Sequence, residues 1–313
     1  MNTAKKWFLI DGNRLLVSGL FVLGAFLVTF WLVSADLITF EPASAVKSLF
    51  ASGIVSGVFS LITITLTVNQ MILSRVFGTI DGLADRIDGS LDFRHTVEDI
   101  AGVPSSPNQP DEFLVLIGET ISERASAFED ECEEFDGESR EEIDEYLADI
   151  RAYADRVEDV EGTEDTLEIV STLLGPAYAQ NLTATDRLLR KYDGELPDPA
   201  RDELEAILEL VKSVAVARQF FKTIAIQQDL AQLSRLLAYF GVPVLLGTFF
   251  VTTIYTTTPT TTVAQPLLPV VVSLGVAVVF IPLAILLSYI LRAASVARYT
   301  VSVGPFVPPE ERL

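Results

Sequence analysis

Four long apolar runs constrain this chain more than any other feature of its sequence. They cover residues 15–35, 49–73, 236–255 and 267–291, and none of them has a charged residue in its interior. About 20 helical residues of this composition are enough to cross the hydrocarbon core of a bilayer. The sequence therefore predicts four membrane spans in two hairpins, one within residues 1–75 and the other, with a short tail, within residues 232–313.

The region between the second and third runs has a different character. Residues 76–231 contain 38 aspartates and glutamates against 13 lysines and arginines, a net charge of -25, whereas the whole chain carries -21. The remainder of the chain is thus slightly basic. This separation of charge from apolar sequence predicts an acidic soluble domain, residues 76–231, inserted between spans two and three.

The orientation in the membrane follows from the positive charges that flank the runs. Three such charges precede the first run, one follows the second, one precedes the third and two follow the fourth: Lys5, Lys6 and Arg14; Arg75; Arg235; Arg292 and Arg298. The opposite ends carry little positive charge, and basic residues favour the cytoplasmic side. We expect a multi-pass protein of the cell membrane with both termini and residues 76–231 in the cytoplasm. The glycosylation sequon Asn181-Leu182-Thr183 is then predicted to be unused.

Helical periodicity dominates the acidic region. Apolar residues recur every three or four positions before and after an Asp136-Gly137 break: Ile117, Ile121, Ala125, Phe128, Cys132 and Phe135, and then Ile143, Leu147, Ile150, Ala154 and Val157. Such spacing predicts two antiparallel amphipathic helices, the second opened by a Ser139/Glu142 capping box. Further helices are expected from Ile80, over 177–192, and from Asp198 towards the third span. The predicted fold is all-α: four transmembrane helices with a cytoplasmic helical bundle between spans two and three.

The most acidic stretch, residues 128–146, holds eleven carboxylates and one arginine. An EF-hand aligned on Gly137 would place Cys132 at the first ligand position and Ile143 at the twelfth, so a calcium loop is excluded. We interpret the carboxylates as solvent-exposed helix faces. Four aspartates at helical spacing, Asp81, Asp85, Asp88 and Asp92, could hold a divalent cation, but nothing in their spacing requires one.

The sequence offers little to a catalytic site. His95 is the only histidine and Cys132 the only cysteine, and no phosphate loop, dinucleotide motif, nucleophile elbow or zinc-protease helix is found. We expect no catalytic residue, no cofactor and no metal. A region of charge -25 would also repel nucleic acid. The basic residues are 16 arginines and 6 lysines, and this composition, with the many carboxylates, suggests a salt-rich cytoplasm, where charge repulsion is screened.

Span two carries a stripe of polar side chains along one helical face. Its members follow one another at spacings of three or four: Ser52, Ser56, Ser60, Thr63, Thr67, Gln70 and Ser74. Small hydroxylated residues favour close helix packing, while a hydroxyl stripe shared by several copies could line a pore. We favour packing, because such hydroxyls can also bond to their own helix. The four runs contain no Asp, Glu, Lys, Arg or His, which argues against a proton-coupled transporter.

Three segments resemble stretches of uncharacterised four-span membrane proteins of halophilic archaea: NQMILSRVFG at 69–78, LDFRHTVED at 91–99 and SVGPFVPPEE at 302–311. This resemblance would cover the whole chain and implies no activity. The order of two spans, a cytoplasmic helical domain and two more spans is also similar to the layout of bestrophin-type anion channels.

Two functions are compatible with these observations. The first is a non-catalytic membrane-anchored scaffold or regulator that binds a cytoplasmic protein through its helical domain. The second is a homo-oligomeric ion channel with span two along the pore. The lipid bilayer is a partner in both, and we expect the protein to form homo-oligomers.

Overall fold

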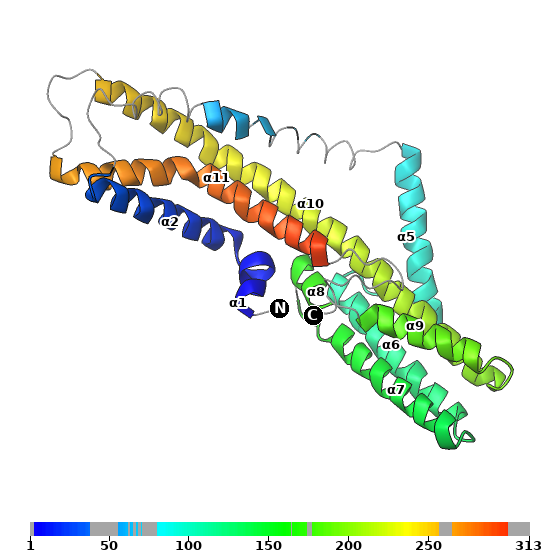
Figure 1. The fold of residues 1–313 in the computed structure, drawn as a ribbon. Coiled ribbons are helices and arrows are strands. Elements are labelled where there is room, and N and C mark those ends of the chain that lie inside the picture. The colour runs from blue at the N-terminus through cyan, green and yellow to red at the C-terminus, as the bar shows by residue number, and fades with distance from the viewer. Residues whose placement is uncertain are drawn as a thin grey trace. The chain divides into compact units, whose positions relative to one another are not determined.

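The computed structural model of the protein describes residues 3–37, 56–61, 63, 64, 67, 70, 80–163, 165–173, 177–256 and 265–299 (Figure 1). Within these residues the chain forms helices and no β-strand, so the predicted all-α class is confirmed for this part. The chain divides into two compact units. We call Gly78–Ala225, with the residues from Ser295 on, the bundle unit, and Asn2–Phe77 with Ile226–Ala294 the apolar unit.

The bundle unit contains five complete helices and the first part of a sixth. They are α5 (Ile80–Ala101), α6 (Pro110–Glu131), α7 (Gly137–Glu158), α8 (Thr166–Thr172), α9 (Ala177–Lys191) and α10 (Asp198–Thr256). As predicted, α10 begins at Asp198, and it continues as one helix into the third apolar run, residues 236–255. The helices enclose one apolar core, in which Phe128, Ile150 and Leu204 are fully buried. Burying an aliphatic or aromatic side chain of this size stabilises the fold by roughly 1.5–3 kcal/mol.

Helices α6 and α7 form the antiparallel pair that the apolar periodicity predicts. Five of the six residues in the first predicted stripe are fully buried, and Phe135 is half-buried: the buried set is Ile117, Ile121, Ala125, Phe128 and Cys132. The chain turns between the helices at Gly137, whose φ of 61° is a conformation that favours glycine. Gly118 lets the two helices approach closely, since a Cβ there would lie 2.6 Å from Cγ of Glu158 and 3.1 Å from the carbonyl oxygen of Ala154.

The predicted Ser139/Glu142 capping box is wrong. Helix α7 begins two residues before Ser139, at Gly137, and its N-cap residue Asp136 makes no side-chain capping bond. Glu142 instead points to the end of α9, where its carboxylate accepts a hydrogen bond from Tyr192 (2.9 Å) and pairs with Lys191. The Glu142 side chain, which the local pattern assigned to a helix cap, thus forms an ion pair with a residue far along the chain.

The apolar unit contains the short α1 (Thr3–Lys6), the π-helix η1 (Trp7–Asp11), α2 (Arg14–Ser34), the second part of α10, η3 (Gln265–Leu267) and, up to Ala294, α11 (Leu268–Tyr299). Helices α10 and α11 pack through Leu233, Leu236 and Leu237 on one side and Ile285 and Tyr289 on the other. Three helices of the described part are long and apolar enough to cross a membrane: Arg14–Ser34, Asp198–Thr248 and Pro269–Val296. They contain or overlap the first, third and fourth predicted runs, and most of the second run lies outside the described residues.

Candidate functional site

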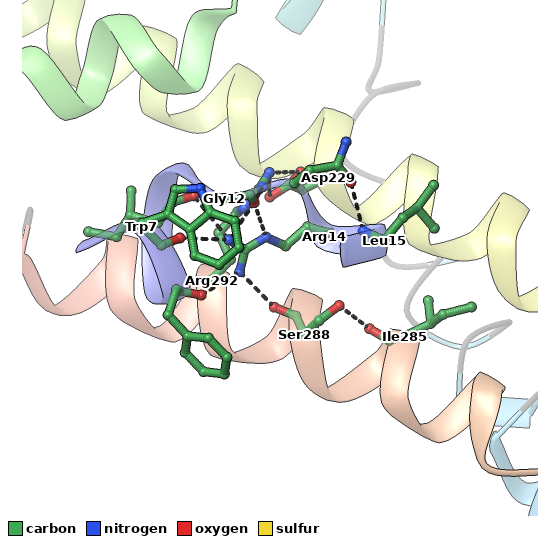
Figure 2. Close-up of polar contacts among 11 residues, drawn as sticks. Trp7, Gly12, Arg14, Leu15, Asp229, Ile285, Ser288 and Arg292 are labelled. Carbon is green, nitrogen blue, oxygen red and sulfur yellow. Dashed lines mark hydrogen bonds and ion pairs between the residues drawn. The ribbon is translucent and has the colours of Figure 1, made fainter. Parts of the chain in front are cut away.

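The most elaborate polar arrangement of the apolar unit surrounds Arg14, the first residue of α2 (Figure 2). Its side chain is only 3% exposed and donates to backbone carbonyl oxygens: Nε to Gly12 (2.8 Å), Nη1 to Phe8 (3.2 Å) and Ser288 (3.4 Å), and Nη2 to Ile10 (3.4 Å), among others. The last carbonyls of a helix lack partners within it. The guanidinium group of Arg14 supplies those partners at the end of the α1–η1 segment.

Gly12 is the residue on which this arrangement depends most closely. Its N–H donates to the carbonyl oxygen of Trp7 at 2.7 Å, which closes the π-helical turn. A Cβ at this position would lie 2.5 Å from that same oxygen and 3.0 Å from the indole ring of Trp7. The close approach therefore excludes any side chain here.

A second arginine, Arg292 on α11, also donates to the carbonyl group of Gly12. Arg292 donates from Nη2 to the oxygen of Gly12 (2.8 Å) and from Nη1 to both carboxylate oxygens of Asp229 on α10 (3.0 and 3.3 Å). The Arg292 and Asp229 side chains are 11% and 19% exposed. This cluster, Gly12, Arg14, Asp229 and Arg292, therefore connects the start of α2 with both α10 and α11.

Two serines extend the polar contacts between α2 and α11. The Ser18 and Ser288 hydroxyls lie 2.9 Å apart, and each is also bonded to a backbone carbonyl of its own helix, Ser18 to Arg14 (2.7 Å) and Ser288 to Ile285 (2.9 Å). The cluster contains two cations, one carboxylate and no nucleophile next to a base. Its chemistry is that of a structural junction. The sequence showed Arg14 and Arg292 only as charges flanking the spans and gave no sign that Asp229 pairs with one of them.

The structure describes five of the seven residues in the predicted span-two stripe: Ser56, Ser60, Thr63, Thr67 and Gln70, with Ser52 and Ser74 outside the described residues. All five are exposed in the single chain. Three of the hydroxyls donate to the carbonyl four residues earlier, each at 2.9 Å: Ser60 to Ser56, Thr63 to Phe59 and Thr67 to Thr63. These three hydroxyls are thus bonded to the backbone of their own segment.

The carboxylates of the acidic stretch 128–146 take part in several ion pairs across the bundle unit. Glu129 pairs with Arg151 at 2.6 Å and with Arg140 at 3.5 Å, and the hydrogen bond from Arg151 lowers the pKa of Glu129. The guanidinium group of Arg187 lies 3.2 Å from the Glu142 carboxylate. The pKa of Glu142 is lowered chiefly by its hydrogen bond with Lys191. Among the described residues, no group of three or more His, Cys, Asp or Glu side chains is arranged to hold a metal ion.

The connection between α5 and α6 is held by Glu98, a residue that sequence reasoning did not single out. Its Oε1 accepts hydrogen bonds from the backbone N–H and the hydroxyl of Ser106, both at 2.7 Å. These bonds lower the pKa of the Glu98 carboxyl. Arg94 donates to the carbonyl oxygen of Ser106 and lies over the Phe113 ring, 5.8 Å from its centroid. Glu98 and Arg94 together fix the loop, Gly102–Gln109, against both helices.

The remaining sequence candidates have simple surroundings. His95 is exposed on α5, whereas Cys132 is fully buried, and burial raises the pKa of its thiol to about 11. Asn181 of the sequon is 6% exposed and donates to the carbonyl oxygen of Ala177 at 2.9 Å within α9.

Comparison with known proteins places the chain in a family without assigning it an activity. No curated protein and no solved structure matches the chain. The family match spans residues 1–312 and is consistent with the expected membership of a family without known activity. The chain belongs to the family of unknown function DUF7972.

Proposed function

We propose that the protein is a non-catalytic, four-span integral membrane protein that acts as a membrane-anchored scaffold or regulator through its helical bundle. In this proposal the second span covers 49–73, and both termini and residues 76–231 are cytoplasmic. The three long apolar helices and the basic residues at their flanks support the membrane part. A cytoplasm of high salt concentration would suit the acidic surface.

The topology can be tested with a single engineered thiol. Glu138→Cys introduces an exposed cysteine on α7, while the native Cys132 is fully buried and reacts poorly because its thiol pKa is raised. A membrane-impermeant maleimide should label this variant only after the cells are opened. Labelling in intact cells would place the bundle outside and refute both proposed roles.

One observation carries the scaffold proposal. In the described part of the bundle unit, the large hydrophobic side chains that are exposed all lie on two helices: Leu83, Ile87 and Leu91 on α5, and Val216 and Phe220 on α10. Ile87 is 61% exposed and Phe220 56%. The rest of the unit presents mainly acidic residues to solvent, so apolar exposure in one region supports binding of a protein partner there.

A photo-crosslinker distinguishes this role from self-assembly. We would introduce a photoreactive amino acid at Ile87, and as a control at the exposed Glu145 on α7. The scaffold proposal expects an adduct with a different protein from position 87 and none from position 145. An adduct of the chain with itself alone, or equal adducts from both positions, would refute it.

The homo-oligomeric channel is a second candidate because of the exposed hydroxyl face of span two. In the single chain, Ser56, Ser60, Thr63, Thr67 and Gln70 are exposed, although a membrane helix usually turns polar side chains away from lipid. If several copies assembled around an axis, these side chains could line a water-filled pore. Ion flux into liposomes at molar salt, reduced by Thr63→Leu and Thr67→Leu without loss of the oligomer, would support the channel. A monomer in mild detergent would rule it out.

A further inference from the structure

A cavity in the bundle unit is formed by α5, the α5–α6 loop, the start of α6 and α10. Its volume is ≈ 380 Å³, within the range of about 300–1,000 Å³ that is usual for small-molecule sites. Fourteen residues line it, and phenylalanines from three helices make up much of the wall: Phe93, Phe113, Phe220 and Phe221. The cavity belongs entirely to the bundle unit, so its geometry does not depend on how the two units are placed.

The wall is suited to an apolar ligand. Phe93 and Phe113 pack with ring centroids 5.6 Å apart, and Phe220 and Phe221 with centroids 5.9 Å apart. Phe113 and Phe221 are buried, whereas Phe220 is mostly exposed at the edge of the cavity. A ligand with an aryl or acyl body would cover this exposed ring and so gain the free energy of removing apolar surface from water.

The charged residues of the lining indicate which charge a ligand would carry. Arg86 and Arg94 are the only charged residues among the fourteen, although the region as a whole is strongly acidic. The nearby carboxylate of Glu98 accepts from the N–H and hydroxyl of Ser106 and also lies 3.9 Å from Nε of Arg94, whose guanidinium group donates in addition to the Ser106 carbonyl. Both arginines have partners of their own, but each guanidinium group carries five N–H donors, so a lining whose only charged residues are two arginines favours an anion and disfavours a cation.

We propose that this cavity binds a small amphiphilic anion, an aryl or acyl chain that carries a carboxylate or phosphate group. The apolar body lies against the phenylalanines, and the anionic group lies near Arg86 and Arg94. A free amphiphile and an anionic membrane lipid share this chemistry. The inference goes beyond the scaffold role and stands whether or not a protein partner binds to the same unit.

The test measures binding of three probes with the same aryl body and different head groups. Phenylbutyrate, phenylbutanol and phenylbutylammonium are titrated calorimetrically into the full-length protein in nanodiscs of zwitterionic lipid, with empty nanodiscs as the blank. We expect phenylbutyrate to bind about tenfold more tightly than the alcohol, a ratio equivalent to about 1.4 kcal/mol, and the ammonium probe to bind most weakly. Equal affinities for the three probes, or no binding, would overturn the proposal.

Two variants and one control locate the probe. Gly89→Trp should abolish binding, because Gly89 lines the cavity and has nothing within 4 Å of an added Cβ, so the indole ring can fill the space. Ala84→Trp places the same ring on the same helix, at an exposed residue that does not line the cavity, and should bind as the unchanged protein does. Arg86→Gln, at an exposed residue, should remove the preference for phenylbutyrate over phenylbutanol and leave the affinity for the alcohol unchanged. Wild-type affinity in Gly89→Trp would refute the site.

The source of the anion is distinguished by the lipid. If the anionic group belongs to a membrane lipid, replacing roughly a third of the nanodisc lipid with phosphatidylglycerol at molar salt, where surface charge is screened, should weaken phenylbutyrate binding severalfold. Unchanged binding would identify a free amphiphile as the natural ligand. Both results keep the anion site and differ only in where the ligand comes from.

Discussion

Replacing Asp229 tests how much the cluster at the start of α2 stabilises the protein. Asp229→Leu removes both carboxylate contacts of Arg292, at 3.0 and 3.3 Å, and leaves a guanidinium group that is only 11% exposed. Breaking a buried ion pair from one side costs about 3–5 kcal/mol. Because the Gly12 carbonyl still accepts from Arg292, and the pair retains some access to water, we expect a cost at or below the lower end of that range, about 2–3 kcal/mol.

The pair itself is isolated by a double-mutant cycle. Arg292→Met should also be destabilising, since it leaves the Asp229 carboxylate without this partner, but the double variant Asp229→Leu/Arg292→Met should cost less than the sum of the two single variants. We expect a coupling of about 1–3 kcal/mol, within the range of about 0.5–3 kcal/mol found for residues that share a hydrogen-bond or salt-bridge network. The exposed pair Arg190 and Asp186, at 79% and 44% exposure, is the control and should couple by less than about 0.5 kcal/mol.

The assay is unfolding of the full chain in detergent micelles by increasing concentrations of a denaturing detergent, followed by circular dichroism. Each variant is measured at low and at molar salt, because a largely buried pair is screened much less than an exposed one. Additive effects of Asp229→Leu and Arg292→Met would show that the contact carries no coupling energy. The view of the cluster as a stabilising junction would then be wrong.

Three further changes test other parts of the structure. Gly12→Ala should destabilise the N-terminal turn by about 1–3 kcal/mol, because its methyl carbon would lie 2.5 Å from a backbone oxygen; limited proteolysis near residue 12 reports this. Gly118→Ala should be about 1–3 kcal/mol less stable than Gly89→Ala in thermal unfolding, since both gain helix propensity but only the first crowds Glu158. Glu142 has a lowered pKa, so its stabilisation is complete above the ordinary glutamate value of 4.5 and is lost as the pH falls through the folded-state pKa. Lowering the pH from about 5 to about 3 should therefore reduce the free energy of unfolding of the unchanged protein more than that of Glu142→Gln.

Local sequence patterns predicted helices where α5, α6, α7, α9 and α10 lie. The spacing from Ile117 to Cys132 identified a face that is fully buried, and the Asp136-Gly137 pair marked the turn, where Gly137 has positive φ. Both signals act within a few residues, which is the range over which a sequence pattern determines backbone conformation. The same reasoning found the start of α10 at Asp198.

Contacts between distant residues could not be predicted in this way. Arg14 lies more than two hundred residues from both Asp229 and Arg292 in the sequence, and the contacts of the three residues depend on how α2, α10 and α11 pack. Glu142 was assigned to a cap because Ser139 precedes it by three residues, yet a cation from α9 binds it instead. The periodicity around Ile87 predicted a helix correctly but could not show that this face of α5 remains exposed.

The burial of Arg14 links the biogenesis of the protein to its final fold. Under the proposed topology, the positive charge at this position helps to keep the N-terminus in the cytoplasm while the first span inserts. In the folded chain the same side chain is enclosed by backbone carbonyls. A lysine there would retain the charge that guides insertion but lacks the planar fork that reaches several acceptors at once. Arg14→Lys should thus give a correctly oriented protein with a loosened N-terminus, which separates the two roles of one residue.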